Sequence, residues 1–185
     1  MGALVERGNR QMVVEKEDEE QNQYLTFQLG GEMFAIGILN IKEIIEYGSL
    51  TEVPMMPEFI RGVINLRGSV VPVVDLSARF GRKRTEITRR TCIVIIEVET
   101  NDERHDVGVV VDSVSEVLEI AAGEIEPPPS FGTRIRADFI HGMGKVNGKF
   151  VIILSVNNVL SLDDLAMLEH ATVADVPLLM ESAGA

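Results

Sequence analysis

The feature of this sequence that most constrains its fold is a weak internal duplication. The stretch Phe59-Ile60-Arg61-Gly62 recurs as Phe139-Ile140-His141-Gly142, and a further glycine follows each stretch at the same distance, Gly68 and Gly148. Each copy then continues into an apolar run. Small repeated units bury apolar faces against each other, so the pattern predicts two similar units of about 80 residues packed together. A chance match is the alternative, because each matched stretch is short.

Each unit is expected to consist of short strands. Residues 24–29 alternate in a period of two, and Gly30-Gly31 supplies the positive φ of a tight hairpin before Met33–Ile36. Turn-forming residues separate five further strands, which we expect at 70–74, 91–98, 107–111, 114–120 and 150–156. Many short strands without a long helical period favour an all-β fold of small barrels over an alternating α/β sheet.

The two ends of the chain differ from this β-rich centre. Residues 1–22 are polar and end in an acidic run, so we expect a disordered tail, with an acidic interaction motif as the alternative. Ser161 and Asp164 approximate a capping box, which predicts a short helix from there to about Glu169. The organisation we predict is one domain over 23–170, with copies at 23–85 and 90–160, and a flexible end over 171–185. Whether the copies exchange strands is left open.

Composition excludes several classes of protein. The net charge of −12 argues against nucleic-acid binding, and the compact basic run Arg82-Lys83-Arg84 is interpreted as a solvated loop. No apolar run approaches the roughly 20 residues that span a bilayer, and the N-terminus lacks a signal peptide. Cys92 stands alone among apolar neighbours, which fits a buried thiol in a reducing compartment. We therefore expect a cytoplasmic protein that does not insert directly into the membrane.

The sequence offers little for catalysis. Its three histidines (His105, His141 and His170) lie far apart, and none has a second ligand at metal-binding spacing. No nucleophile elbow, phosphate loop or dinucleotide-binding loop is present. We expect no catalytic residue, no metal, no cofactor and no small-molecule ligand. An enzyme or ligand-binding barrel is the alternative class, which turnover or a bound metal or nucleotide would support.

The duplication also separates residues of the fold from candidates for function. The glycines occur in both copies, so they are interpreted as backbone requirements. Asn65, Arg67 and Asp75 belong to the first copy only; the second has Lys145, Asn147 and Ser155 at the matching positions. Arg67 is expected to lie exposed in a turn between a glycine and a strand. An ordinary surface ion pair is the alternative interpretation of this arginine.

The stretch Phe59–Leu76 closely resembles the hallmark of the CheW family, R/K-G-x-x-N-L-R-G-x-x-x-P-V-x-D-L, and matches it throughout. The resemblance continues outside this stretch and covers about residues 22–168. It implies two five-stranded SH3-like barrels side by side. It also implies a non-catalytic adaptor that couples transmembrane chemoreceptors (methyl-accepting chemotaxis proteins) to the histidine kinase CheA, in the cytoplasm at membrane-associated receptor arrays. A chemosensory pathway with a non-flagellar output is the alternative.

The resemblance also implies two contact surfaces. The regulatory domain of CheA is expected to bind at Ile41 and Gly62, although Gly62 could equally be a turn glycine. The cytoplasmic tip of the receptor is expected in a groove between the barrels, where Arg67 would pair with Glu43 and offer its remaining donors. Whether two valines of this set lie in the groove or in the core is open. The five receptor positions are Glu43, Arg67, Gly108, Val114 and Val117.

Overall fold

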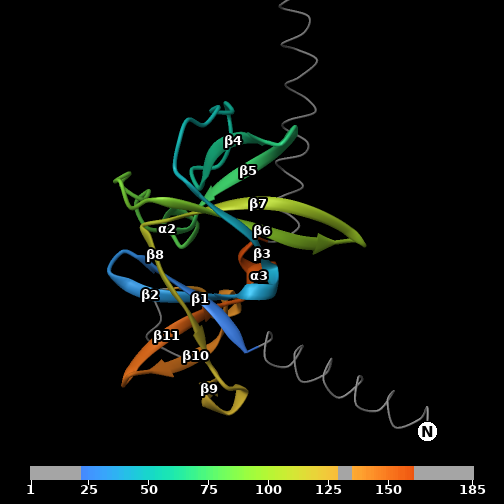
Figure 1. Ribbon diagram of the computed structural model, residues 1–185. Helices are drawn as coiled ribbons and strands as arrows, with labels where there is room; N and C mark the ends of the chain where they lie inside the picture. Colours follow the sequence, from blue (N-terminus) through green and yellow to red (C-terminus); the bar gives the residue numbers. More distant parts are fainter. Residues whose placement is uncertain (1–21, 129–134, 161–185) are drawn as a thin grey trace, which may run out of the picture.

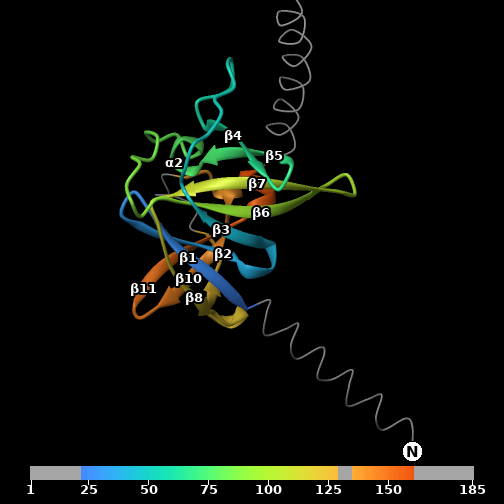
Figure 2. The same ribbon diagram turned by 45° about the horizontal axis from the view of Figure 1, so that its top comes forward.

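The computed structural model describes residues 22–128 and 135–160, which form two antiparallel-rich sheets lying one above the other (Figures 1 and 2). The six-stranded sheet has the order β8 (Ser113–Glu119), β1 (Gln23–Leu29), β2 (Glu32–Gly37), β11 (Lys149–Leu154), β10 (Ile140–Val146) and β9 (Ile125–Glu126). The five-stranded sheet has the order β3 (Ile41–Glu46), β6 (Cys92–Thr100), β7 (Glu103–Val111), β5 (Ser69–Asp75) and β4 (Ile60–Leu66). The short helices are η1 (Ile38–Asn40), α2 (Leu76–Arg79), η2 (Ala122–Glu124), η3 (Ala137–Phe139) and α3 (Val156–Val159).

The two sheets share one strand order. β8-β1-β2-β11-β10 matches β3-β6-β7-β5-β4 strand for strand, and each parallel contact, β2 with β11 and β5 with β7, occupies the same place. The hairpins, however, are exchanged. The β1–β2 hairpin of the first copy lies in the sheet of the second, and the β6–β7 hairpin of the second copy lies in the sheet of the first. Neither sheet therefore corresponds to one copy.

Three apolar clusters form the core. The largest contains residues of both sheets, such as Phe27 and Leu25 on β1 and Val94 and Ile96 on β6, so it lies between the sheets. The neighbouring residues on the same strands belong to two smaller clusters, one for each sheet. Both faces of β6 are thus buried, which explains its continuous apolar run. Aromatic residues are few but concentrated: rings stack from Phe27 to Phe34 to Phe80, whose ring lies 6.1 Å from Phe139.

The all-β prediction is confirmed, and the strands expected from apolar runs are present with ends shifted by a few residues. The strands predicted from sequence did not include the glycine-bearing motifs, which form strands β4 and β10. A register shift accompanies the glycine in each, between Ile60 and Gly62 and between Ile140 and Gly142. The predicted helix at 161–169 and both predicted tails lie outside the described residues. Within residues 22–128 and 135–160, no helix is long and apolar enough to cross a membrane.

Candidate partner-binding surface

The hallmark segment folds as the β4–β5 hairpin followed by α2. Arg67 and Gly68 form its tip with φ of +53° and +87°, as the two central residues of a tight hairpin turn require. The Asn65 side-chain oxygen accepts a hydrogen bond from the Gly68 amide at 2.9 Å and closes the turn. The fixed turn presents the Arg67 side chain, which is 80% exposed, at the end of a paired hairpin.

Asp75 is the centre of a buried polar cluster. Its carboxylate is 0% exposed and accepts hydrogen bonds from Arg61 Nε at 2.8 Å and from the Thr85 amide at 2.9 Å. It also caps α2, because its Oδ1 accepts from the Ala78 amide at 3.1 Å. The Arg61 guanidinium donates in addition to the Thr85 carbonyl oxygen. This cluster fixes the chain on both sides of α2, so the expectation that Asp75 is functional is corrected: its role is structural.

Gly62 is buried, and its own chain occupies the space beside it. A Cβ at Gly62 would overlap the Thr51 carbonyl oxygen, which accepts a hydrogen bond from Val63 at 2.9 Å. At the matching position, a Cβ on Gly142 would lie 2.5 Å from Ile125. The interpretation as a structural glycine therefore has a physical reason in both copies. The segment that contains Thr51 covers the side of Gly62 on which a Cβ would lie.

The predicted pair between Arg67 and Glu43 is present, with Arg67 Nη2 2.9 Å from Glu43 Oε2. Glu43 lies on β3, one of the two edge strands of the five-stranded sheet, so the pair links the tip of the β4–β5 hairpin to the opposite edge of that sheet. An ion pair this exposed contributes at most about 1 kcal/mol to stability. Within the described part of the chain the guanidinium makes no other hydrogen bond or ion pair, and the side chain is exposed.

The remaining predicted positions divide between interior and surface. Gly108 is buried in β7, paired on one side with Val73 and on the other with Ile95. On β8, Val114 packs against the central cluster, whereas Val117 is 49% exposed. The matching residues of β3 behave in the same way, since Ile41 packs on that cluster and Ile44 is exposed.

β3 and β8 are the matching edge strands of the two sheets. Each carries an irregularity in its pairing, between Ile41 and Glu43 in β3 and opposite Thr26 in β8. At the second site the Thr26 hydroxyl donates to the Glu116 carbonyl at 2.8 Å and accepts from its amide. Because such a bulge re-aims side chains, it lets one apolar residue face the core and the next one face solvent.

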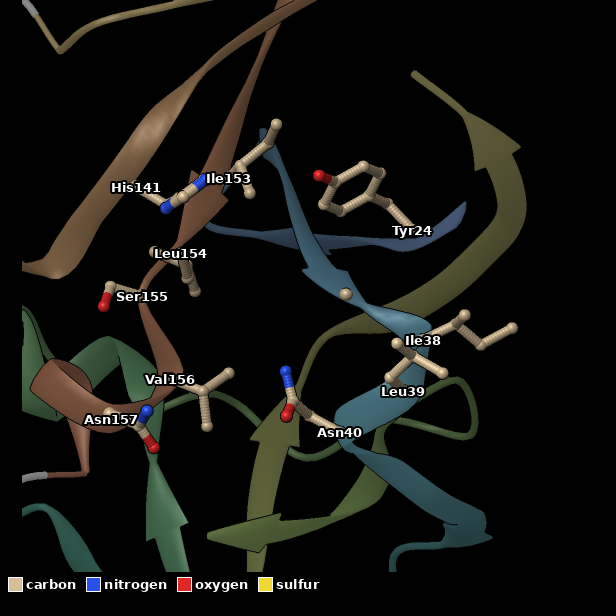
Figure 3. Close-up of a pocket in the computed structure, with 11 residues that line it drawn as sticks. Tyr24, Ile38, Leu39, Asn40, His141, Ile153, Leu154, Ser155, Val156 and Asn157 are labelled. Carbon is tan, nitrogen blue, oxygen red and sulfur yellow. The ribbon is translucent and has the colours of Figure 1, made fainter. Parts of the chain in front are cut away.

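The described surface is hollowed beside η1 and again between β3 and β4. One hollow, of about 270 Å³, lies where η1 meets β11 and α3, and Figure 3 shows Tyr24 and Asn40 facing His141 and Asn157 across it. Burial raises the pKa of Tyr24, so its hydroxyl is neutral at physiological pH. The other, of about 410 Å³, lies between β3 and β4 beside Thr51. No group of three potential metal ligands occurs among the described residues.

Comparison with known proteins agrees with the geometry of the hairpin. The model of the CheW-like domain family matches residues 23–164. The chain belongs to the CheW family. The chemotaxis protein CheW of Klebsiella aerogenes is 32% identical over 148 residues, which cover 80% of this chain and 87% of the relative. CheW of Helicobacter pylori is 34% identical over 149 residues, with 80% and 87% covered.

A solved CheW structure also matches this fold. The scaffolding protein CheW of Thermoanaerobacter tengcongensis aligns with a TM-score of 0.68 and 33% identity, over 78% of this chain and 90% of that one. The chain is thus a scaffold protein of the chemotaxis type. Within the CheW hallmark, Arg61, Asn65 and Asp75 are used inside the hairpin and its surroundings. Among the charged hallmark residues, Arg61 and Asp75 are wholly or largely buried, whereas Arg67 lies at the surface.

Sequence reasoning missed the polar cluster around Asp75 and its partner Thr85. A signal was present, because an aspartate directly before Leu76 is a common helix N-cap. Thr85, in contrast, lies in a connection between α2 and β6 that carries no motif. Only the fold brings it to Asp75.

Proposed function

We propose that this CheW-family chain is a non-catalytic adaptor that couples transmembrane chemoreceptors to the regulatory domain of the histidine kinase CheA. It acts in the cytoplasm and is recruited to membrane-associated receptor arrays. One observation carries the proposal. The side chains of Arg61, Asn65 and Asp75 make hydrogen bonds that hold the hallmark segment together, whereas Arg67 is exposed at the tip of its hairpin. An exposed arginine that contributes little to stability, on a turn with a fixed backbone conformation, is well placed to bind a partner protein.

The receptor surface in this proposal combines a charged and an apolar part. Arg67, oriented by Glu43, offers its free donors to a carboxylate or a carbonyl on the receptor tip. Val117 and Ile44 supply exposed apolar area on the matching edge strands, which suits a helical partner. Val114 and Gly108 support this surface from inside. The kinase surface lies on the five-stranded sheet, at Ile41 and at the segment around Thr51 that packs against Gly62.

Replacement of Arg67 by Ala tests the receptor surface. We expect loss of receptor binding with unfolding midpoints close to those of the wild type, since the Arg67–Glu43 pair is exposed. The matched control is Arg104→Ala, because Arg104 is 71% exposed and pairs with Glu97 on another hairpin. The measurement is co-elution of the protein with a receptor cytoplasmic fragment and a CheA regulatory fragment. Equal receptor binding by both variants would remove Arg67 from the surface, and failure of the wild type to bind either fragment would refute the adaptor function.

A further inference from the structure

Residues 81–91 connect α2 to β6 and are unusually basic for an acidic protein; this segment is the basic loop. The whole chain has a net charge of −12, yet this loop contains one acidic residue, Glu86, and five basic ones. The basic residues are Arg82, Lys83, Arg84, Arg89 and Arg90. Such a reversal of charge on one short segment makes a local positive field in a negative surrounding.

The basic loop has a fixed conformation. Thr85 is buried and donates its amide to Asp75 at 2.9 Å, which anchors the middle of the loop. Further along, the Thr88 amide donates to the Thr91 hydroxyl at 2.8 Å, and the Arg90 amide donates to the Thr88 hydroxyl at 3.2 Å. Because the backbone is already ordered, a partner that binds the loop would lose little conformational entropy.

The cations of the loop fall into two groups. Arg82 pairs with Glu32 at 3.2 Å, and Arg84 donates to the Glu58 carbonyl at 2.9 Å, so these two serve the fold. No hydrogen bond or ion pair joins the side chains of the second group to any residue in the described ranges. That group consists of Lys83, Arg89 and Arg90. Ile87, 42% exposed, lies among them.

The basic loop adjoins the proposed kinase surface. Arg84 Nη2 lies 3.4 Å from the Ile60 carbonyl oxygen, and the Arg61 guanidinium donates to the Thr85 carbonyl. The loop is therefore packed against the start of β4, the strand that carries Gly62. We propose that Lys83, Arg89 and Arg90 form an electrostatic extension of this surface that binds acidic side chains of a partner protein. Identifying that partner as the CheA regulatory domain rests on the function proposed above.

The chemistry favours an acidic protein surface over nucleic acid or an anionic membrane. A long polyanion or a charged bilayer meets the field of the whole molecule, whose net charge of −12 repels it. A few carboxylates on a protein meet mainly the charges within about 8–10 Å, the screening length at physiological salt. The exposed Ile87 among the cations adds an apolar contact of the size that a protein side chain fills.

The test compares two double charge reversals in the full chain. Lys83→Glu with Arg89→Glu alters the basic loop, and Lys145→Glu with Lys149→Glu makes the same change in net charge on the exposed β10–β11 hairpin. A charge-preserving variant, Lys83→Arg with Arg89→Lys, serves as the second control. Affinity for the CheA regulatory fragment is measured by titration at low and at high salt, after circular dichroism shows that each variant is folded.

We expect the loop reversal to weaken binding about tenfold at low salt, with a smaller effect at high salt, because surface charges act through a screened field. The charge-preserving variant and the β10–β11 variant should bind like the wild type. Equal loss in both reversals would assign the effect to net charge and overturn the proposal. Unchanged binding, or wild-type binding to phosphatidylglycerol vesicles that the loop reversal abolishes, would also overturn it. If the wild type itself does not bind the fragment, the proposed function fails instead.

Discussion

Asp75 gives the sharpest test of how the hallmark hairpin is built. Replacing Asp75 by Ala removes the partner of Arg61, an acceptor for the Thr85 amide and the N-cap of α2 in one step. The Arg61 side chain is only 14% exposed, so its charge would be left largely buried without a counter-charge. Breaking a buried pair in this way costs about 3–5 kcal/mol, and a lost cap alone about 1 kcal/mol. We expect a destabilisation of at least about 3 kcal/mol.

The duplicated fold supplies a matched control for this prediction. Ser155 occupies the position of Asp75 in the second copy and precedes α3, but its side chain makes no capping hydrogen bond. Ser155→Ala should therefore change the free energy of unfolding by less than about 0.5 kcal/mol. Urea denaturation followed by circular dichroism measures both variants. A loss below about 1 kcal/mol for Asp75→Ala, or equal losses in the two variants, would refute the reasoning that this carboxylate organises the hairpin.

Two further predictions concern the matching strands. Gly62→Ala should both lower the free energy of unfolding and weaken kinase binding, because a Cβ at this position displaces the Thr51 segment. Urea denaturation measures the first effect and pull-down the second. Weaker binding with unchanged stability would contradict this mechanism. Val117→Glu should weaken receptor binding while the protein stays folded, whereas Val114→Glu should destabilise it, because only Val114 packs on the core. Identical behaviour of the two valine variants in thermal unfolding would show that the proposed division is wrong.

Strands could be predicted from sequence where the burial of a strand shows in its own pattern of apolar residues. The alternation at 24–29 and the apolar run at 91–98 are local patterns, and both gave strands. Strands β4 and β10 were missed because Gly62 and Gly142 resemble turn residues unless the crossing segment is known. The ion pair between Arg67 and Glu43 was predicted from the family resemblance, and the structure contains it. The burial of Asp75 depends on Thr85, which no local pattern connects to it.

The exchange of hairpins could not be predicted, because two similar copies give the same local signals whichever sheet a hairpin joins.

The exchange of hairpins makes the stability of each copy depend on the other. Four strand pairings join the copies: β1 with β8, β2 with β11, β3 with β6 and β5 with β7. If the chain is divided within the basic loop, between residues 86 and 87, the described part of the first fragment keeps the hairpins β1–β2 and β4–β5 and the bridge between Thr51 and Val63.

Neither fragment should fold alone. Isolated two-stranded hairpins are marginally stable at best, and the central cluster needs residues of both fragments, such as Phe27 from one and Val94 from the other. We expect amide proton spectra of little dispersion for fragments 1–86 and 87–185 separately, and dispersed spectra when they are mixed in equal amounts. Cooperative unfolding of either fragment by itself would contradict this, since it would mean that this copy can form a stable sheet of its own. In that case the exchanged hairpins would be one of two accessible arrangements, and the inter-sheet cluster would not be required for folding.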